Sequence, residues 1–300
     1  MKTYVVIYNG FWNATPPDAV RRLHTALVAR GLSARMLPHT ACTVTVAPQV
    51  SVHPFCVGDV ALFWDKDTRL ARALEDGGVH VYNTAASVAL CDDKSETHRV
   101  LSAAGIPMPE TLVAPMAYVE VSDAIEPFLS AAETRLGFPM VVKECFGSLG
   151  EQVYLADTPA ALRELVYAMH HRPFLLQRFV ADSAGKDRRL YVVGDRVVAA
   201  MERHNPKDFR ANIAIGGTAC AYTPTPQECD LACRCCRALG LQFGGVDLLG
   251  DGSVCEVNSN AQMSGIIACT GIDVAGAIVD YVLTTERDNG YGTTEGCVCR

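Results

Sequence analysis

Short apolar runs separated by polar segments recur along the first ninety residues. They are typical of buried strands, and they fall at residues 5–7, 60–64 and 79–82. The segments between them include amphipathic stretches with apolar residues at helical steps of three and four. Strands that alternate with helices indicate a parallel sheet. The pattern therefore predicts a small α/β domain over residues 1–90.

The first of these helices is expected to begin near Thr15. Asp18 stands three residues after Thr15, as in a capping box, and Pro16 occupies the first turn, where proline is tolerated. Gly31 is expected to end the helix, because glycine readily adopts the left-handed conformation found there. A second helix is predicted at residues 70–76 and is stopped by the two glycines that follow it.

A different pattern begins near residue 139, where strand-like apolar runs follow one another closely. Gly194 and Asp195 are typical of a two-residue hairpin turn. The predicted strands cover residues 140–144, 152–155, 174–180, 189–193 and 197–201. The predicted helices cover residues 92–104, 158–170 with Asp157 as its cap, and 227–239, and a last hairpin covers residues 243–258. We expect a central domain with a linker helix over residues 91–175, a C-terminal domain over residues 176–284, and a polar tail over residues 285–300.

Composition narrows the class of protein. The 300 residues are 49% hydrophobic and 20% charged, which is typical of a globular chain with two or three small domains. The net charge of -7 argues against a large nucleic-acid surface, which needs a basic stripe. No apolar run approaches the ~18 residues that cross a bilayer, and the opening residues lack the features of a signal peptide. We therefore expect a cytoplasmic protein with neither nucleic acid nor membrane as a partner.

The chain contains 13 cysteines, and reduced thiols fit this expected location better than disulfides. The densest group is Cys229, Cys233, Cys235 and Cys236, which lacks the paired spacing of zinc sites. On a helix, Cys229, Cys233 and Cys236 share one face. Packing of these small apolar side chains against the core is therefore favoured over metal binding.

The last predicted hairpin carries the most specific chemical signal. Asp251 and Gly252 favour a type I′ turn, and counting outward from this turn places Asp247 opposite Glu256. Asn258 lies two residues past Glu256 and therefore on the same face of the sheet. Facing carboxylates repel each other unless a cation lies between them, and Mg²⁺ prefers oxygen ligands. A solvent-exposed polar face is the alternative, but the neighbouring valines and leucines do not fit it.

Lys143 lies in a predicted buried strand just before a loop that contains Gly147 and Gly150. Glycines let backbone N–H groups approach a phosphate closely, and a nearby lysine supplies positive charge. By themselves these residues also fit an ordinary turn. Several arginines follow, and beside a metal they would suit anionic substrates, although a single arginine is usually a solvated surface residue. These arginines are Arg188, Arg189, Arg203 and Arg210.

Together these motifs resemble one known family, and they occur in the order that it has. The chain resembles the RimK branch of the ATP-grasp ligases, the ribosomal-protein glutamate ligases and their relatives, from about residue 91 to residue 265. The matching stretches lie at residues 91–94, 137–143, 147–150, 176–180, 187–201, 209–212, 216–217, 245–249 and 256–260. The resemblance implies an α+β ATP-grasp fold: a small N-terminal parallel-sheet domain followed by two ATP-grasp subdomains with the nucleotide between them.

The resemblance also implies which residues hold ATP and its metal. The residues expected near the phosphates are Lys94, Lys143, Gly147, Ser148, Gly150, Arg210 and Asn212. Those expected around the adenine are Gln177, Arg178, Phe179 and Val180, with Asp187 at the ribose. Those expected to bind two Mg²⁺ ions, or Mn²⁺ in their place, are Asp247, Glu256 and Asn258. The candidates for stabilising negative charge during catalysis are Arg203 and Arg210.

Two positions depart from the family pattern. Relatives commonly carry an acidic residue where this chain has Arg178, so a side-chain contact to the nucleotide would differ here while a backbone contact would survive. Residues 261–265 have the sequence Ala-Gln-Met-Ser-Gly, which differs from the Pro-Gly-Leu form of the ribosomal-protein ligases. Because this segment adjoins the metal residues, the substrate can differ too.

The activity that the resemblance implies is ATP-dependent carbon–nitrogen ligation with release of ADP. ATP phosphorylates a carboxylate, and an amine, such as that of glutamate, then attacks the acyl phosphate. The partners are a small carboxylate and an amino acid, or a peptide or protein C-terminus, and homo-oligomers are common in the family. Two alternatives stay open: a regulatory module that binds nucleotide without ligation, and an ATP-grasp kinase or cyclase that acts on a carboxylate.

Overall fold

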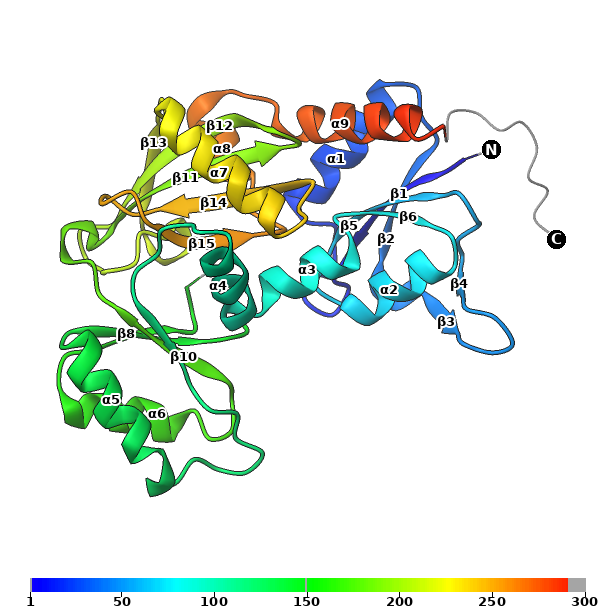
Figure 1. The fold of residues 1–300 in the computed structure, drawn as a ribbon. Coiled ribbons are helices and arrows are strands. Elements are labelled where there is room, and N and C mark those ends of the chain that lie inside the picture. The colour runs from blue at the N-terminus through cyan, green and yellow to red at the C-terminus, as the bar shows by residue number, and fades with distance from the viewer. Residues whose placement is uncertain (1, 149, 291–300) are drawn as a thin grey trace.

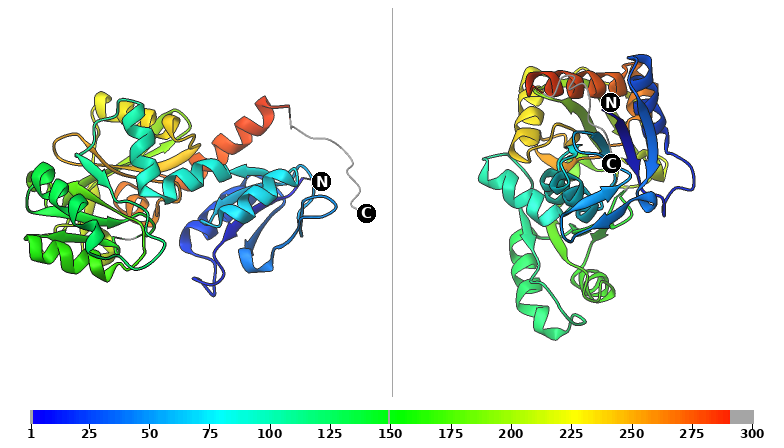
Figure 2. Two further views of the ribbon diagram at one scale, coloured as in Figure 1. Left: turned by 60° about the horizontal axis from the view of Figure 1, so that its bottom comes forward. Right: turned by 90° about the vertical axis from the view of Figure 1, so that its right-hand side faces the viewer.

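The computed structural model describes residues 2–148 and 150–290 of the chain. Three main sheets, each with its own helices, follow one another from the N-terminus, as Figures 1 and 2 show. The first is blue to cyan in Figure 1, the second is green, and the third runs from green to orange. The predicted order of one parallel-sheet domain and two further subdomains is therefore confirmed.

The first sheet is parallel throughout, in the order β2-β1-β5-β6. Its strands are β1 (Tyr4–Tyr8), β2 (Ala34–Pro38), β5 (Val60–Trp64) and β6 (His80–Tyr82). β1 is buried along its whole length and β5 nearly so, which explains their continuous apolar sequences. The accompanying helices are α1 (Asp18–Ala29), α2 (Thr68–Asp76) and α3 (Ala85–Asp92), and a separate hairpin is formed by β3 (Thr43–Thr45) and β4 (Ser51–His53).

Helix α1 begins three residues later than predicted. Pro17 precedes its first residue without a side-chain hydrogen bond, so the capping box predicted at Thr15 does not form. A residue that precedes proline is disfavoured in the helical conformation, and Pro16 precedes Pro17. The helix therefore cannot extend back to Thr15. Its end agrees with the prediction, because Gly31 adopts a φ of +75° just after the last turn.

The second sheet is antiparallel, in the order β7-β10-β8-β9. Its strands are β7 (Thr111–Val113), β8 (Met140–Glu144), β9 (Val153–Ala156) and β10 (Phe174–Arg178). Its helices α5 (Glu126–Leu136) and α6 (Pro159–Ala168) bury their apolar faces against the sheet. The cap of α6 is Thr158 and not Asp157, because the Thr158 hydroxyl accepts the backbone N–H of Ala161. The helix predicted at residues 92–104 is α4 (Lys94–Ala103), which begins two residues later than predicted because Asp93 is its cap, and α3 is a separate helix that ends at Asp92.

The third sheet has five antiparallel strands in the order β13-β12-β11-β14-β15. These strands are β11 (Lys186–Val193), β12 (Arg196–His204), β13 (Thr218–Ala221), β14 (Phe243–Leu248) and β15 (Val254–Asn258). Helix α7 (Pro226–Ala238) packs on one face, and α8 (Ser264–Thr270) and α9 (Val274–Asp288) pack on the other. Cysteines of α7 do join the core: Cys236 is buried as predicted, Cys235 is buried although it was not on the predicted face, and Cys229 and Cys233 are only partly buried.

The C-terminal helix α9 joins the third sheet to the N-terminal domain by packing along α1 (Figure 1). Glu286 on α9 is 3% exposed, and it accepts hydrogen bonds from the Lys2 ammonium and from the Tyr82 hydroxyl at 2.7 Å. His80 Nδ1 lies 3.0 Å from the same carboxylate. Residues 285–288 of the predicted polar tail thus belong to a helix, and residues 291–300 lie outside the described part. The boundaries proposed at residues 90, 175 and 284 stay predictions.

Within the described ranges, the structure has no single helix that is both long enough and apolar enough to cross a membrane. Helices α8 and α9 meet that criterion only when they are counted together, and they are bent by 112° relative to each other. One face of α9 is buried against α1 and the third sheet.

Replacement of Glu286 by Gln should lower the free energy of unfolding by about 2 kcal/mol, because a buried charged acceptor loses strong hydrogen bonds. Burial raises the pKa of Glu286, but hydrogen bonds from Lys2, His80 and Tyr82 outweigh it and hold the pKa below its ordinary value. The stabilisation is therefore present above about pH 4.5 and lost as the pH falls through the lowered pKa. Urea unfolding at pH 7 and pH 3.5 measures the loss of stability, with the exposed Asp288→Asn variant as the control. Equal stability of E286Q and wild type at pH 7 would contradict the prediction.

Candidate nucleotide and metal site

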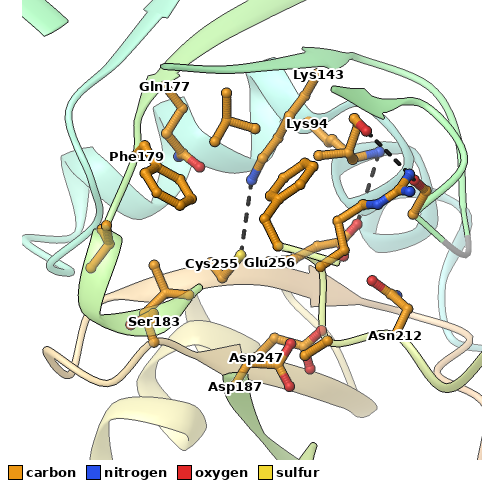
Figure 3. Close-up of a pocket in the computed structure, with 18 of the residues that line it drawn as sticks. Lys94, Lys143, Gln177, Phe179, Ser183, Asp187, Asn212, Asp247, Cys255 and Glu256 are labelled. Atoms are coloured by element: carbon orange, nitrogen blue, oxygen red, sulfur yellow. Dashed lines mark hydrogen bonds and ion pairs between the residues drawn. The ribbon is translucent and has the colours of Figure 1, made fainter. Parts of the chain in front are cut away.

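A pocket lies between the second and third sheets, and it gathers the predicted site residues (Figure 3). The predicted residues that line it are Lys94, Lys143, Gly147, Ser148, Gly150, Gln177, Arg178, Phe179, Val180, Asp187, Arg203, Arg210, Asn212, Asp247 and Glu256. Asn258 is the predicted residue that is absent from this lining, although it follows Glu256 on the same face of β15. The structure thus brings the set together, while the role of each residue stays a prediction.

The β14–β15 hairpin places Asp247 opposite Glu256, as predicted. The same turn count places Leu248 opposite Cys255, and this is wrong, because Leu248 pairs with Val254. Next to the turn, the two strands pair one residue out of the predicted register. A bulge at Cys255 restores the predicted register at the pair Asp247 and Glu256. A bulge adds one unpaired residue to one strand. The facing carboxylates therefore depend on two local irregularities that compensate each other.

Two buried arginines hold the carboxylate of Asp247. Arg189 donates from Nε at 2.7 Å and from Nη2 at 2.6 Å, and Arg203 donates from Nη2 at 2.9 Å. Arg203 also donates to both carboxylate oxygens of Asp187 at 2.6 Å. Since all four residues come from the adjacent strands β11, β12 and β14, this cluster of two cations and two anions is a fixed part of the pocket floor.

Burial and these arginines act in opposite directions on the two carboxylates. Burial raises the pKa of Asp247, but Arg189 and Arg203 outweigh it and lower the pKa to about 2. Burial also raises the pKa of Asp187, and Arg203 offsets this only in part. Asp247 is therefore the more firmly ionised of the two acids at neutral pH, which suits a ligand for a cation.

Two lysines lie across the pocket from these acids (Figure 3). Lys94 is the first residue of α4, and its backbone N–H donates to the carbonyl of Cys145 at 3.0 Å, which fixes the helix start beside β8. Its ammonium lies 3.3 Å from the Gly147 carbonyl and 3.9 Å from Glu256. Lys143 Nζ has the Cys255 thiol at 3.9 Å. Both ammonium groups thus have weak partners in the pocket and suit the oxygens of a phosphate.

Burial is the main reason that the pKa of Lys94 lies below its ordinary value. Glu256 opposes this shift, whereas Lys66 and Lys143 add to it. One turn further along α4, His98 is 7% exposed, and burial together with Lys143 and Lys94 lowers its pKa to about 3. The imidazole of His98 is therefore neutral behind the two lysines and does not compete with an incoming anion.

The donor set on β14 and β15 fits a hard divalent cation. Among the residues that the structure describes, Glu256 has only Lys94 at the outer limit of an ion pair, so its oxygens are available. Oxygen ligands from Asp, Glu and Asn are those that Mg²⁺ takes. Asp247 would share its oxygens with Arg189 and Arg203. Across residues 2–148 and 150–290, no three side chains of His, Cys, Asp or Glu converge as a metal site, so a cation here needs ligands beyond these types. Asn258 or phosphate oxygens can supply them.

The glycine loop lies against residues that follow β12. Gly150 has a φ of +80°, and a Cβ there would meet Asn212 Oδ1 at 2.9 Å, so glycine is required on both counts. Arg210 donates to the Gly150 carbonyl at 2.6 Å and is paired with Asp208 at 2.8 Å. Arg210 and Asn212 therefore hold one end of the loop above the lysines.

The contacts at the end of β10 explain the departure at Arg178. Its side chain points to Glu110, with an ion pair of 2.7 Å, and also donates to the carbonyl of Arg135. The buried amide of Gln177 donates to the Thr111 hydroxyl at 2.9 Å. The arginine at position 178 therefore stabilises the outer edge of the second sheet, and the backbone of residues 178–180 stays available to the pocket.

Two residues at the site were not predicted from the sequence. Arg189 is one of several arginines in the chain, yet it stands two residues after Asp187 on a strand, and that spacing places both on one face. Cys255 was assigned to an ordinary strand pair. Its place beside Lys143 depends on the bulge, which the sequence does not signal.

Replacement of Arg203 by Gln should lower the free energy of unfolding by about 3 kcal/mol, because it leaves two buried carboxylates with one arginine. The loss of stability should be larger at pH 8 than at pH 5. The pKa of Asp187 is already raised by burial, and removal of Arg203 raises it further. A folded protein that holds a carboxyl with a raised pKa loses stability as the pH rises toward that pKa. Adding Asp187→Asn should restore part of the stability. Urea unfolding at pH 5 and pH 8 measures R203Q and the double variant, with exposed Arg196→Gln on the same strand as the control. A double variant no more stable than R203Q would contradict the account.

Known proteins resemble this chain over most of its length. The family model described as the RimK-like ATP-grasp domain matches residues 91–282. The curated "Probable alpha-L-glutamate ligase" of Xanthomonas campestris pv. campestris (strain 8004) is 34% identical over 281 residues, which cover 88% of this chain and 94% of that protein.

Solved structures show the same architecture. The RimK domain ATP-grasp protein from Sphaerobacter thermophilus DSM 20745 superposes with a TM-score of 0.72 at 27% identity, over 94% of this chain and 99% of that one. The ATP-grasp ligase PsnB, solved with a phosphomimetic precursor variant, Mg and ADP, has a TM-score of 0.68 at 18% identity over 95% and 98% of the two chains, which shows the fold alone. The resemblance and the fold class predicted from the sequence are confirmed, and the chain belongs to the RimK-like ATP-grasp family of ATP-dependent carboxylate–amine ligases.

Proposed function

We propose that this chain joins a carboxylate to the amine of an amino acid through an acyl phosphate, with ATP and two Mg²⁺ ions. The observation that carries the proposal is the pocket in which Lys94 and Lys143 face the opposed pair Asp247 and Glu256. Positive charge for the phosphates and oxygen ligands for a cation thus meet in one cavity. The curated relatives are named as glutamate ligases, which supports an amino acid as the amine substrate.

The residues of the pocket divide the work by position. Lys94 and Lys143 bind the phosphates, and Arg210 holds the glycine loop over them through Gly150. Arg203 lies between the two acids of the pocket floor, where it can stabilise negative charge that develops on the substrate. No side-chain nucleophile is needed, because positioning and charge stabilisation are the main contributions to phosphoryl transfer.

Asp247, Glu256 and Asn258 are the proposed ligands of the metal. Bound Mg²⁺ supplies neutralising charge to the phosphates and to the entering carboxylate. The low pKa of Asp247 keeps that ligand ionised, and the weak pairing of Glu256 leaves its oxygens accessible. Asn258 has a buried side-chain nitrogen that finds no partner among the described residues, and its amide oxygen is the atom that would bind the metal.

The two alternative activities differ in their products. A non-ligating module binds nucleotide without sustained ADP release, and a kinase or cyclase releases ADP without adding a second substrate. We expect ADP release to require both a carboxylate and an amino acid, and the product mass to equal their sum less one water. A coupled ADP assay over pooled amino acids and carboxylates, followed by mass spectrometry, measures this. ADP release without the amine, or a phosphorylated final product, would favour the kinase.

Replacement of Glu256 by Gln should reduce kcat at least about 100-fold, because a metal ligand and its charge are lost together. The fold should survive, since Glu256 is partly exposed to the pocket and, within the described part of the chain, has only a long ion pair with Lys94. Steady-state ADP release and the thermal unfolding midpoint together check this. Glu164→Gln on the exposed face of α6 is the matched control. A folded E256Q protein with full activity would rule out the metal assignment.

A further inference from the structure

The carboxyl edge of the first sheet carries polar residues that the nucleotide pocket does not use. β1 and β5 are neighbours, and the chain leaves them in opposite directions toward β2 and β6. Parallel α/β sheets bind ligands at such a divergence, beyond the carboxyl ends of the strands. Asn9 follows β1 and Asp65 follows β5, and the Asn9 amide donates to Asp65 Oδ1 at 3.2 Å.

The two oxygens of Asp65 have different surroundings. Oδ1 accepts three hydrogen bonds: from the Asn9 amide, from the backbone N–H of Lys66 at 2.6 Å, and from that of Asp67 at 3.3 Å. Oδ2 is buried and receives no hydrogen bond from any group in residues 2–148 and 150–290. Asp65 as a whole residue is 5% exposed. The loop therefore fixes the carboxylate through one oxygen and leaves the other in need of a donor.

His39 does not supply that donor. Its Nδ1 lies 3.4 Å from Asp65 Oδ2, a distance within reach of an ion pair. The same Nδ1 accepts the backbone N–H of Gly10 at 2.9 Å, so it carries no proton to give to Asp65. The edge of the Phe11 ring packs on the imidazole with ring centroids 5.2 Å apart. His39 thus adds a second acceptor beside the carboxylate.

Asn260 brings the segment that follows β15 to the same place. Its side-chain nitrogen donates to the backbone carbonyl of Asp65 at 2.7 Å. Its Oδ1 is buried and finds no donor within the described ranges. Asn260 lies two residues after Asn258, so this contact joins the N-terminal sheet to the end of β15. Two acceptors without donors, from two different domains, therefore lie around one residue next to the proposed metal ligands.

Lys66, the cationic residue next to Asp65, already has partners of its own. Lys66 donates to Asp92 at 2.6 Å and lies 3.4 Å from the carbonyl of Gly147 in the glycine loop. It therefore connects this edge to the phosphate site without neutralising Asp65 Oδ2. An incoming carboxylate would meet acceptors and negative charge here. A positively charged group with several N–H donors would instead satisfy the two oxygens that lack a donor, Asp65 Oδ2 and Asn260 Oδ1.

We infer that Asp65 and Asn260 bind an ammonium group of a substrate of this ligase. The inference rests on the proposed function and specifies one of its substrates as an amine-bearing compound in its cationic form, such as a zwitterionic amino acid or a diamino acid. The ammonium donates to Asp65 Oδ2 and Asn260 Oδ1, beside the strand that carries Glu256 and Asn258. Asp65 is thus a residue that determines substrate specificity by charge.

The test is calorimetric binding to the full chain saturated with MgADP, with two pairs of probes. L-glutamate and glutarate differ by one α-ammonium group, and L-ornithine and L-norvaline differ by one distal ammonium group. In wild type, the member that carries the extra ammonium should bind at least tenfold more tightly in one pair or in both. Asp65→Asn should abolish this difference, because Oδ1 keeps its three donors and the amide nitrogen takes the place of Oδ2.

Asp67→Asn is the matched control, since Asp67 caps α2 through its side chain and asparagine caps equally well. It should keep the discrimination within twofold of wild type, and D65N should keep its affinity for MgADP. No discrimination by wild type in either pair, or equal discrimination by D65N, would overturn the inference, and so would a parallel loss of MgADP affinity in D65N. Because binding is measured without turnover, failure of the ligase proposal in the ADP assay is a separate result.

Discussion

The pocket between the second and third sheets depends on one buried cluster of charges, in which Arg189 and Arg203 hold Asp247 and Arg203 also holds Asp187. Isolated buried charges are costly, and removal of one partner leaves the others uncompensated. The cluster therefore requires that β11, β12 and β14 pair in this register. That register in turn presents Asp247 opposite Glu256 on the next strand. The geometry of the proposed metal site is thus a consequence of the charge pairing between these arginines and aspartates.

The opposite wall of the pocket has a different character. Lys94 and Lys143 are buried, yet their nearest partners are a carbonyl, a thiol and a distant carboxylate. Burial lowers the pKa of Lys94, which reflects incomplete compensation of its charge. An anion with several oxygens would complete it. The charges of the pocket floor compensate each other, whereas the charges of the two lysines are not compensated. This arrangement favours the binding of a nucleotide phosphate together with its cation over the binding of either one alone.

Local pattern was enough to predict the parallel first sheet and most strands of the other two sheets, but it did not predict β2, β7 or β13. The gathering of the site residues was implied by the family resemblance. Long-range features were not accessible in the same way. Asp247 was correctly placed opposite Glu256, but the bulge at Cys255 arises from the turn and the neighbouring strands and leaves no mark in the sequence. The start of α1 was misplaced because two consecutive prolines outweigh a capping pattern. The pairing of Asp65 with Asn260 joins residues 195 positions apart and needs the fold itself.

The central claim is that the β14–β15 hairpin holds the cation that accompanies the nucleotide. It is tested most directly by measuring the affinity for ADP as a function of Mg²⁺ concentration in wild type and in Asp247→Asn. The account predicts that Mg²⁺ tightens ADP binding at least tenfold in wild type and leaves it nearly unchanged in the variant. An equal dependence on Mg²⁺ in the two proteins, with both folded, would contradict the account.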